Sequence, residues 1–204
     1  MTIDAVRQAS PPMAPSAARN PAVARSTMGL PDLPSILAMG PFEDRLDAED
    51  LAEAFAEVRR RSAAQLIVFG TGRQRSTVVR CAFAHGVGSD VHLLGSDPAG
   101  WSDVVAAADV VIPGTASGTM SLLDVLSAGR PVVAPIDPTT TRLVLPTSTG
   151  LLYRRGHVNA MAAALLRILT NSTLRHGMTC RASAVTCRRP LLTRLQSTHG
   201  SHDA

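Results

Sequence analysis

A strand, a loop of small residues, a helix and a second strand follow one another within residues 108–135, and this order strongly constrains the fold. The apolar run Val110–Pro113 ends at the small-residue segment Gly114–Gly118. A helical run, Thr119–Ala128, separates it from a second apolar run, Pro131–Pro135. Two strands joined through a helix lie parallel, because the helix carries the chain back to the edge where the first strand began. The pattern predicts a βαβ unit of a parallel sheet.

The loop of this unit suits an anionic ligand. A helix N-terminus presents unpaired N–H groups and the positive end of the helix dipole, which favours phosphate. Gly114 and Gly118 would let a ligand approach the backbone closely. Asp124 lies one turn further on, where a carboxylate can accept hydrogen bonds from ligand hydroxyls. The alternative is that the loop binds nothing and that Asp124 faces solvent.

Apolar runs and helical runs alternate along most of the chain. The expected strands are Pro34–Gly40, Gln65–Phe69, Val91–Leu94, Val110–Pro113, Val132–Ala134 and Gly150–Tyr153. The alternation predicts an α/β fold with a Rossmann-like parallel sheet and helices on both faces. Ligands of such folds lie at the carboxyl ends of the strands. The candidate binding loops are therefore Gly40–Leu46, Gly70–Arg75, Gly95–Gly100 and Gly114–Ser121.

Helical periodicity marks the segments between these strands. The expected helices are Ala48–Arg60, Ser76–His85, Trp101–Ala108, Thr119–Ala128 and Val158–Leu169. Asp47 is the expected N-cap of the first, and Ser172 or Thr173 is expected to cap a last helix that ends near Ala182.

The composition is typical of one domain with a tail at each end. Residues 1–28 are rich in Pro, Ala, Ser and Arg and are expected to be disordered or a linker. The domain is expected to span residues 29–183, and residues 184–204 are expected to be an irregular tail. Apolar residues make up 45% of the 204, enough for a sizeable core, whereas aromatic residues make up only 3%.

Charge and cysteine usage exclude several classes of function. The net charge is +4 without a basic stripe interleaved with aromatic residues, so nucleic-acid binding has little support. All basic residues are Arg, which excludes a lysine nucleophile. The three cysteines lack metal or redox spacing, and the terminal His199 and His202 do not indicate a metal site. Because no apolar run resembles a signal peptide or a membrane span, we expect a cytoplasmic protein, with work at a membrane surface left open.

The order of the motifs resembles the C-terminal, nucleotide-sugar-binding domain of GT-B glycosyltransferases of family 4 (group 1). The similarity covers about Val23–Ser183 and is carried by several stretches together: MGLPDLPSILAMGPF, AQLIVFGTG, DVHLLGSDP with VVAAADVVIP, SGTMSLLDVLSAGRPVVAP and TGLLYRRGHVNAMAAALLRILTNSTLRHGM. The resemblance implies one half of a GT-B fold. It also implies a nucleotide-diphosphate sugar as donor substrate and no further cofactor.

The resemblance also implies a set of donor-binding residues. The diphosphate would lie at Gly118, Thr119, Met120 and Ser121, and Asp124 would hold the ribose in place of a glutamate. Turn residues after the first two strands complete the set: Gly40, Arg45, Gly70 and Gly72.

The chain departs from the family pattern in two ways. Ala116 or Ser117 stands where the family has a glutamate that contacts the sugar, and Pro41 replaces an arginine, so that Arg45 only approximates a lysine of the pattern. Only the short segment 1–28 precedes the domain, whereas the family has an acceptor-binding domain there. We therefore expect no transfer by this chain alone, assign no catalytic acid or base, and expect a separate acceptor-binding domain or protein as partner.

Two alternative functions remain open beside the binding of a sugar donor in a glycosyltransferase. A non-catalytic nucleotide-binding or regulatory module would keep the fold without the chemistry. A dinucleotide-binding oxidoreductase domain would use Gly70-Thr71-Gly72, but Arg75 occupies the position of its third glycine.

Overall fold

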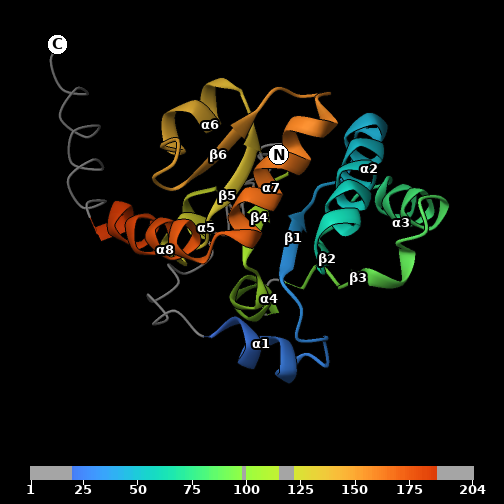
Figure 1. Cartoon of the computed structure of the whole chain (residues 1–204), viewed down its shortest axis with the longest axis horizontal. Helices are drawn as coiled ribbons and strands as arrows, with labels where there is room; N and C mark the ends of the chain where they lie inside the picture. The colour runs from blue at the N-terminus through green and yellow to red at the C-terminus, as the bar shows by residue number, and fades with distance from the viewer. Residues whose placement is uncertain (1–19, 98–99, 115–121, 188–204) are drawn as a thin grey trace, which may run out of the picture.

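The computed structural model describes residues 20–97, 100–114 and 122–187 (Figure 1). Within this part of the chain the strands are β1 (Ser35–Met39), β2 (Gln65–Phe69), β3 (Val91–Leu93), β4 (Val110–Ile112), β5 (Val132–Pro135) and β6 (Gly150–Tyr153). The helices are α1 (Pro21–Thr27), α2 (Arg45–Arg61), α3 (Arg75–Ala84), α4 (Trp101–Ala107), α5 (Leu122–Ser127), α6 (Pro138–Leu143), α7 (Val158–Thr170) and α8 (Ser172–Cys187), with a 3₁₀ turn at Gly88–Asp90.

All described strand pairs are parallel, and the sheet order is β3-β2-β1-β4-β5-β6. The chain runs outward from β1 to β3 and then crosses back to β4, so that β1 and β4 are neighbours whose connections lead in opposite directions. Ligands of doubly wound folds lie at this switch point, beyond the carboxyl ends of the two strands. The predicted Rossmann-like α/β fold is confirmed.

Alternation along β1 shows why helices cover both faces of the sheet. Ile36 and Ala38 pack on one face with residues of α2, α3 and α7. Leu37 and Met39 pack on the opposite face with residues of α1, α4 and α5. Successive strand side chains point to opposite faces, and all of β1 is buried, as a strand between two layers of helices requires.

Helix α2 begins earlier than the sequence pattern predicted. Its N-cap is Asp44 rather than Asp47, because the Asp44 carboxylate accepts hydrogen bonds from the backbone N–H groups of Leu46 at 2.8 Å and of Asp47 at 3.4 Å. Asp47 lies instead in the first helical turn, where the helix dipole stabilises a negative charge.

Both ends of the domain differ from the expected boundaries. Helix α1 lies within residues 1–28, the segment predicted to be a linker, and its Arg25 is buried. At the other end α8 continues to Cys187, beyond the boundary predicted at residue 183. The α8 cap is also corrected, because the Asn171 side chain accepts a hydrogen bond from the Leu174 N–H at 2.8 Å, a role expected of Ser172 or Thr173.

Helix α6 was not predicted, although the sequence carries a start signal. Asp137 caps it by accepting from the N–H groups of Thr139 and Thr140, and the Thr140 hydroxyl accepts from the Asp137 N–H. Pro138 occupies the first helical position, where its missing N–H costs nothing.

Candidate functional site

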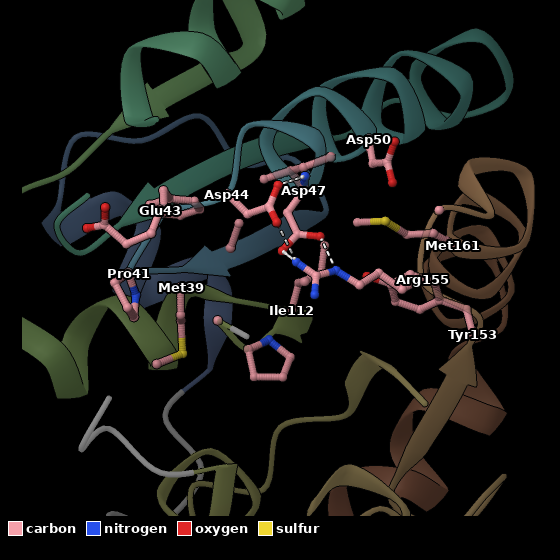
Figure 2. A pocket seen from close by; sticks show the side chains of 16 residues that line it. Met39, Pro41, Glu43, Asp44, Asp47, Asp50, Ile112, Tyr153, Arg155 and Met161 are labelled. Carbon is pink, nitrogen blue, oxygen red and sulfur yellow. Dashed lines mark hydrogen bonds and ion pairs between the residues drawn. The ribbon is translucent and has the colours of Figure 1, made fainter. Parts of the chain in front are cut away.

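A pocket opens at the carboxyl ends of β1 and β4, at the switch point of the sheet (Figure 2). It contains about 550 Å³ of empty space, part of which is open to solvent. Its walls come from the ends of β1, β4 and β6, from the start of α2 and from α7. The lining residues are Ala38, Met39, Pro41, Phe42, Glu43, Asp44, Asp47, Asp50, Leu51, Ile112, Pro113, Gly114, Tyr153, Arg155, Gly156 and Met161.

An arginine and two aspartates are joined across this pocket. Figure 2 shows Arg155, just after β6, reaching toward the first turn of α2. Its Nε donates to Asp47 Oδ1 at 2.7 Å, and its Nη2 donates to Asp44 Oδ2 at 3.0 Å and also to Asp47 Oδ2. The cluster connects segments 108 and 111 residues apart in the sequence. The hydrogen bond that Arg155 donates to Asp47 raises the pKa of Arg155, which therefore stays cationic.

The charges of the described lining residues are predominantly negative. Glu43, Asp44, Asp47 and Asp50 carry carboxylates, and Arg155 is the one cation among these side chains. Burial, together with the charges of Asp47 and Glu53, raises the pKa of Asp50 above its usual value. This wall of the pocket therefore repels an anion unless the anion reaches Arg155.

Tyr153 forms an uncharged part of the same wall. It is the last residue of β6, and burial is the main reason that its pKa lies well above the usual value for a phenol. The hydroxyl therefore stays protonated at neutral pH. A protonated phenol can donate a hydrogen bond to a ligand oxygen.

Glycines bring the loops at this edge into backbone contact. A Cβ atom on Gly114 would lie 2.7 Å from the carbonyl oxygens of Met39 and Gly40. One on Gly40 would lie 2.6 Å from the Thr71 oxygen, and one on Gly72 would lie 2.3 Å from the Phe42 nitrogen. The loops after β1, β2 and β4 therefore approach one another as closely as they do because these positions lack side chains.

The candidate residues named from the sequence are only partly assembled here. Gly114, the first residue of the predicted anion loop, lines the pocket, which confirms that the loop leaves β4 at the carboxyl edge. Gly118, Thr119, Met120 and Ser121 lie outside the described residues. Gly40, Gly70 and Gly72 are beside the pocket and hold its loops together, but they are not among its lining residues.

Two charged candidates also lie outside the pocket lining. Arg45 is exposed on α2, where its Nε donates to Glu49 Oε1 at 2.7 Å. Asp124 lies in the first turn of α5, with its side chain half-buried. The cation that does line the pocket, Arg155, was not identified from the sequence. The sequence did carry one signal for it, because Arg155 follows the carboxyl end of an expected strand, where ligands of such folds bind.

Two further findings concern metal sites and membrane spans in the described part of the chain. Among the residues that the structure describes, no three His, Cys, Asp or Glu side chains are grouped so that they could hold a metal ion. In the same residues no helix is both long and apolar enough to cross a membrane.

Comparison with known proteins identifies the family. The family model "Glycosyl transferases group 1" matches residues 33–171. The chain therefore belongs to this glycosyltransferase family, as the sequence motifs predicted. A search of curated proteins found no significant match.

Solved structures share the fold at low sequence identity. The C-terminal domain of the group 1 glycosyltransferase LpcC from Francisella tularensis is 13% identical with a TM-score of 0.71, and the match covers 84% of this chain and 93% of that one. Sucrose-phosphate synthase from Thermosynechococcus elongatus is 23% identical with a TM-score of 0.67, over 88% of this chain and 50% of that one. Anabaena HepE in complex with UDP and glucose is 18% identical with a TM-score of 0.70, over 87% and 52%. The chain thus spans about half the length of the last two proteins and has the fold of one half of a GT-B glycosyltransferase.

Proposed function

We propose that this chain binds a nucleotide-diphosphate sugar at the carboxyl edge of its sheet and provides the donor side of a glycosyl transfer to an unknown acceptor. The observation that carries the proposal is the pocket at the ends of β1 and β4, which Gly114 lines where the small-residue loop begins. The UDP bound to HepE supports it, since that protein has the same fold.

The residues divide between the two parts of the donor. The diphosphate would bind the backbone N–H groups of Gly118, Thr119, Met120 and Ser121, just ahead of α5. Asp124 would accept hydrogen bonds from the ribose hydroxyls. Gly40, Gly70 and Gly72 would shape the site through the loop contacts described above, and Arg45 would reach the diphosphate only by leaving Glu49.

The second candidate function is a nucleotide-binding or regulatory module without turnover. Stabilising a leaving diphosphate requires positive groups aimed at the developing charge. In the described pocket lining Arg155 is already engaged by Asp44 and Asp47, and the nearby Arg45 is engaged by Glu49. This charge distribution favours binding over catalysis.

Titration calorimetry with UDP, GDP and ADP tests the binding site. We expect weak binding, on the order of micromolar to millimolar Kd, because the acidic wall opposes an anion. Asp124→Ala should weaken binding about tenfold, the effect of losing a hydrogen bond to a charged group. Asp124→Asn is the matched variant, because it retains an acceptor oxygen, and it should weaken binding less. Unchanged affinity in Asp124→Ala would remove this residue from the site, and absence of binding by all three nucleotides would contradict the proposed function.

A further inference from the structure

The cation that lines the pocket is held by carboxylates of its own chain. Asp47 accepts from Nε and Nη2 of Arg155, and Asp44 accepts from Nη2. A guanidinium fork matches a phosphate as well as it matches a carboxylate, and both interactions are strong because both partners are charged. The two aspartates therefore occupy Nε and Nη2, two of the three guanidinium nitrogens that an anionic ligand would use.

The two sides of this cluster differ in their freedom to move. Asp44 is fixed by its role as the N-cap of α2, where it accepts from the Leu46 N–H at 2.8 Å. Arg155 lies in a turn next to Gly156, and about half of its side chain is exposed. A change of partner would therefore move the arginine and leave the aspartates in place.

We propose that Asp44 and Asp47 act as built-in competitors for Arg155, so that they set the affinity and the selectivity of the pocket for phosphate-bearing ligands. The inference rests on the proposed function, because it concerns the diphosphate of the same nucleotide ligand. On binding, Arg155 exchanges a carboxylate for a phosphate oxygen, and the two aspartates are left facing an anion. Only a ligand that offers several charged oxygens compensates for that exchange, which selects a nucleoside diphosphate over a nucleoside.

A set of charge-removing variants tests the competition. In the double variant Asp44→Asn with Asp47→Asn, the first asparagine still caps α2, since asparagine is as good an N-cap as aspartate. We expect about tenfold tighter binding of UDP, the effect of freeing one charge-assisted contact, and little change for uridine. Circular dichroism and thermal unfolding establish that each variant is folded.

Two further variants distinguish competition for Arg155 from a general change in the electrostatic potential of the pocket. Asp50→Asn removes one negative charge from the same pocket. The hydrogen bonds of Arg155 go to Asp44 and Asp47, whereas Asp50 interacts with Arg155 only through its charge, so the gain from this variant should be small. Adding Arg155→Gln to the double variant should abolish the tenfold gain. In the wild-type background Arg155→Gln should weaken UDP binding, because the phosphate loses its cation while the charges of Asp44 and Asp47 remain.

The outcomes distinguish this inference from the proposed function. If the wild type binds UDP and the double variant binds it equally well, the competition is refuted and donor binding stands. Equal gains from Asp50→Asn, or a gain that survives Arg155→Gln, would also refute it. If neither the wild type nor the double variant binds UDP, GDP or ADP, the proposed function and this inference fail together.

Discussion

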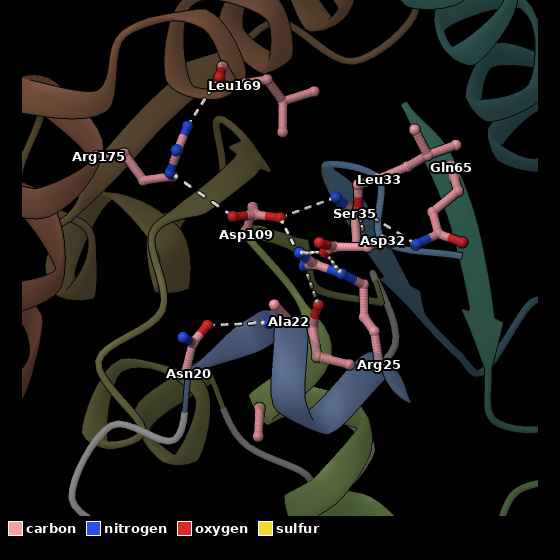
Figure 3. A network of polar contacts seen from close by, with 12 residues as sticks. Asn20, Ala22, Arg25, Asp32, Leu33, Ser35, Gln65, Asp109, Leu169 and Arg175 are labelled. Carbon is pink, nitrogen blue, oxygen red and sulfur yellow. Dashed lines mark hydrogen bonds and ion pairs between the residues drawn. The ribbon is translucent and has the colours of Figure 1, made fainter. Parts of the chain in front are cut away.

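Arg25 and Asp109, 84 residues apart in the sequence, form a buried ion pair with Nη1 and Oδ2 3.1 Å apart (Figure 3). The same guanidinium donates to the carbonyl of Ala107, and the same carboxylate accepts from the Ser35 N–H. The pair thus joins α1 to the starts of β1 and β4, at the edge of the sheet opposite the pocket.

Arg25→Ala should lower the free energy of unfolding by about 2–4 kcal/mol, because it removes the buried guanidinium that neutralises the charge of Asp109. The loss is moderated by Arg175, whose Nε lies 3.6 Å from Asp109 Oδ1. Asp32→Ala is the matched control: Asp32 also contacts Arg25, but its side chain is 72% exposed, and its loss should cost less than about 1 kcal/mol. Urea denaturation measures both, and equal losses would contradict the buried role of the Arg25–Asp109 pair.

Gly72→Ala should destabilise the fold by about 2–4 kcal/mol. Its φ of +129° is unfavourable for alanine, and the new Cβ would lie 2.3 Å from the Phe42 nitrogen. Gly86→Ala separates these two causes, because Gly86 has a φ of +76° but no atom within 4 Å of the added Cβ. That variant should cost about 1 kcal/mol. Thermal unfolding that gave the same loss for both would mean that the β1 and β2 loops do not need their close approach.

Asp50→Asn should raise the free energy of unfolding at neutral pH by a few tenths of a kcal/mol. Burial raises the pKa of Asp50 in the folded state, so the folded state binds the proton more tightly than the unfolded state does. Stability due to this group therefore falls as pH rises from the unfolded pKa, near 3.8, through the raised folded pKa. The asparagine variant avoids this loss, and its advantage should disappear below about pH 3, where the carboxyl is protonated in both states. Urea denaturation at several pH values checks this, and an advantage that persists unchanged in acid would contradict it.

The purified chain should show no glycosyl transfer and at most slow hydrolysis of the donor. The pocket is partly open to solvent, and water weakens every electrostatic contact with a leaving phosphate. The nearby cations Arg45 and Arg155 are paired with carboxylates. Chromatographic assays with a panel of nucleotide sugars and of lipid and sugar acceptors test this expectation. Robust transfer would show that the chain positions an acceptor and a donor by itself.

Local signals in the sequence were sufficient for the order of the six strands and of most helices, α1 and α6 excepted, and for much of the family assignment. Strands β2 and β6 have the bounds that were predicted, because each is a short apolar run that polar or glycine residues delimit. Helix α7 was predicted to within one residue from its apolar periodicity. The bounds of these elements depend on residues that are close together in the sequence, so the sequence alone reveals them.

Tertiary structure decided which charges meet in the pocket. The sequence indicated Arg45, four residues before Glu49, but that spacing also makes an ion pair along one helix face, and this is where the arginine is engaged. Arg155 reaches the start of α2 only because β6 and β1 end at the same edge of a parallel sheet.

Tertiary contacts also explain why the glycines are needed and why the N-terminal helix packs onto the domain. The sequence indicated Gly40 and Gly72 as residues of ligand-binding turns. In the structure each lies against the backbone of a loop 30 or more residues away in the sequence, and this close contact leaves no room for a side chain. Arg25, in a segment whose composition indicated a linker, is buried because Asp109 lies opposite it. Composition and periodicity determine most of the segments that form strands and helices, whereas the partners of buried and charged side chains depend on contacts that arise only when the sheet has assembled.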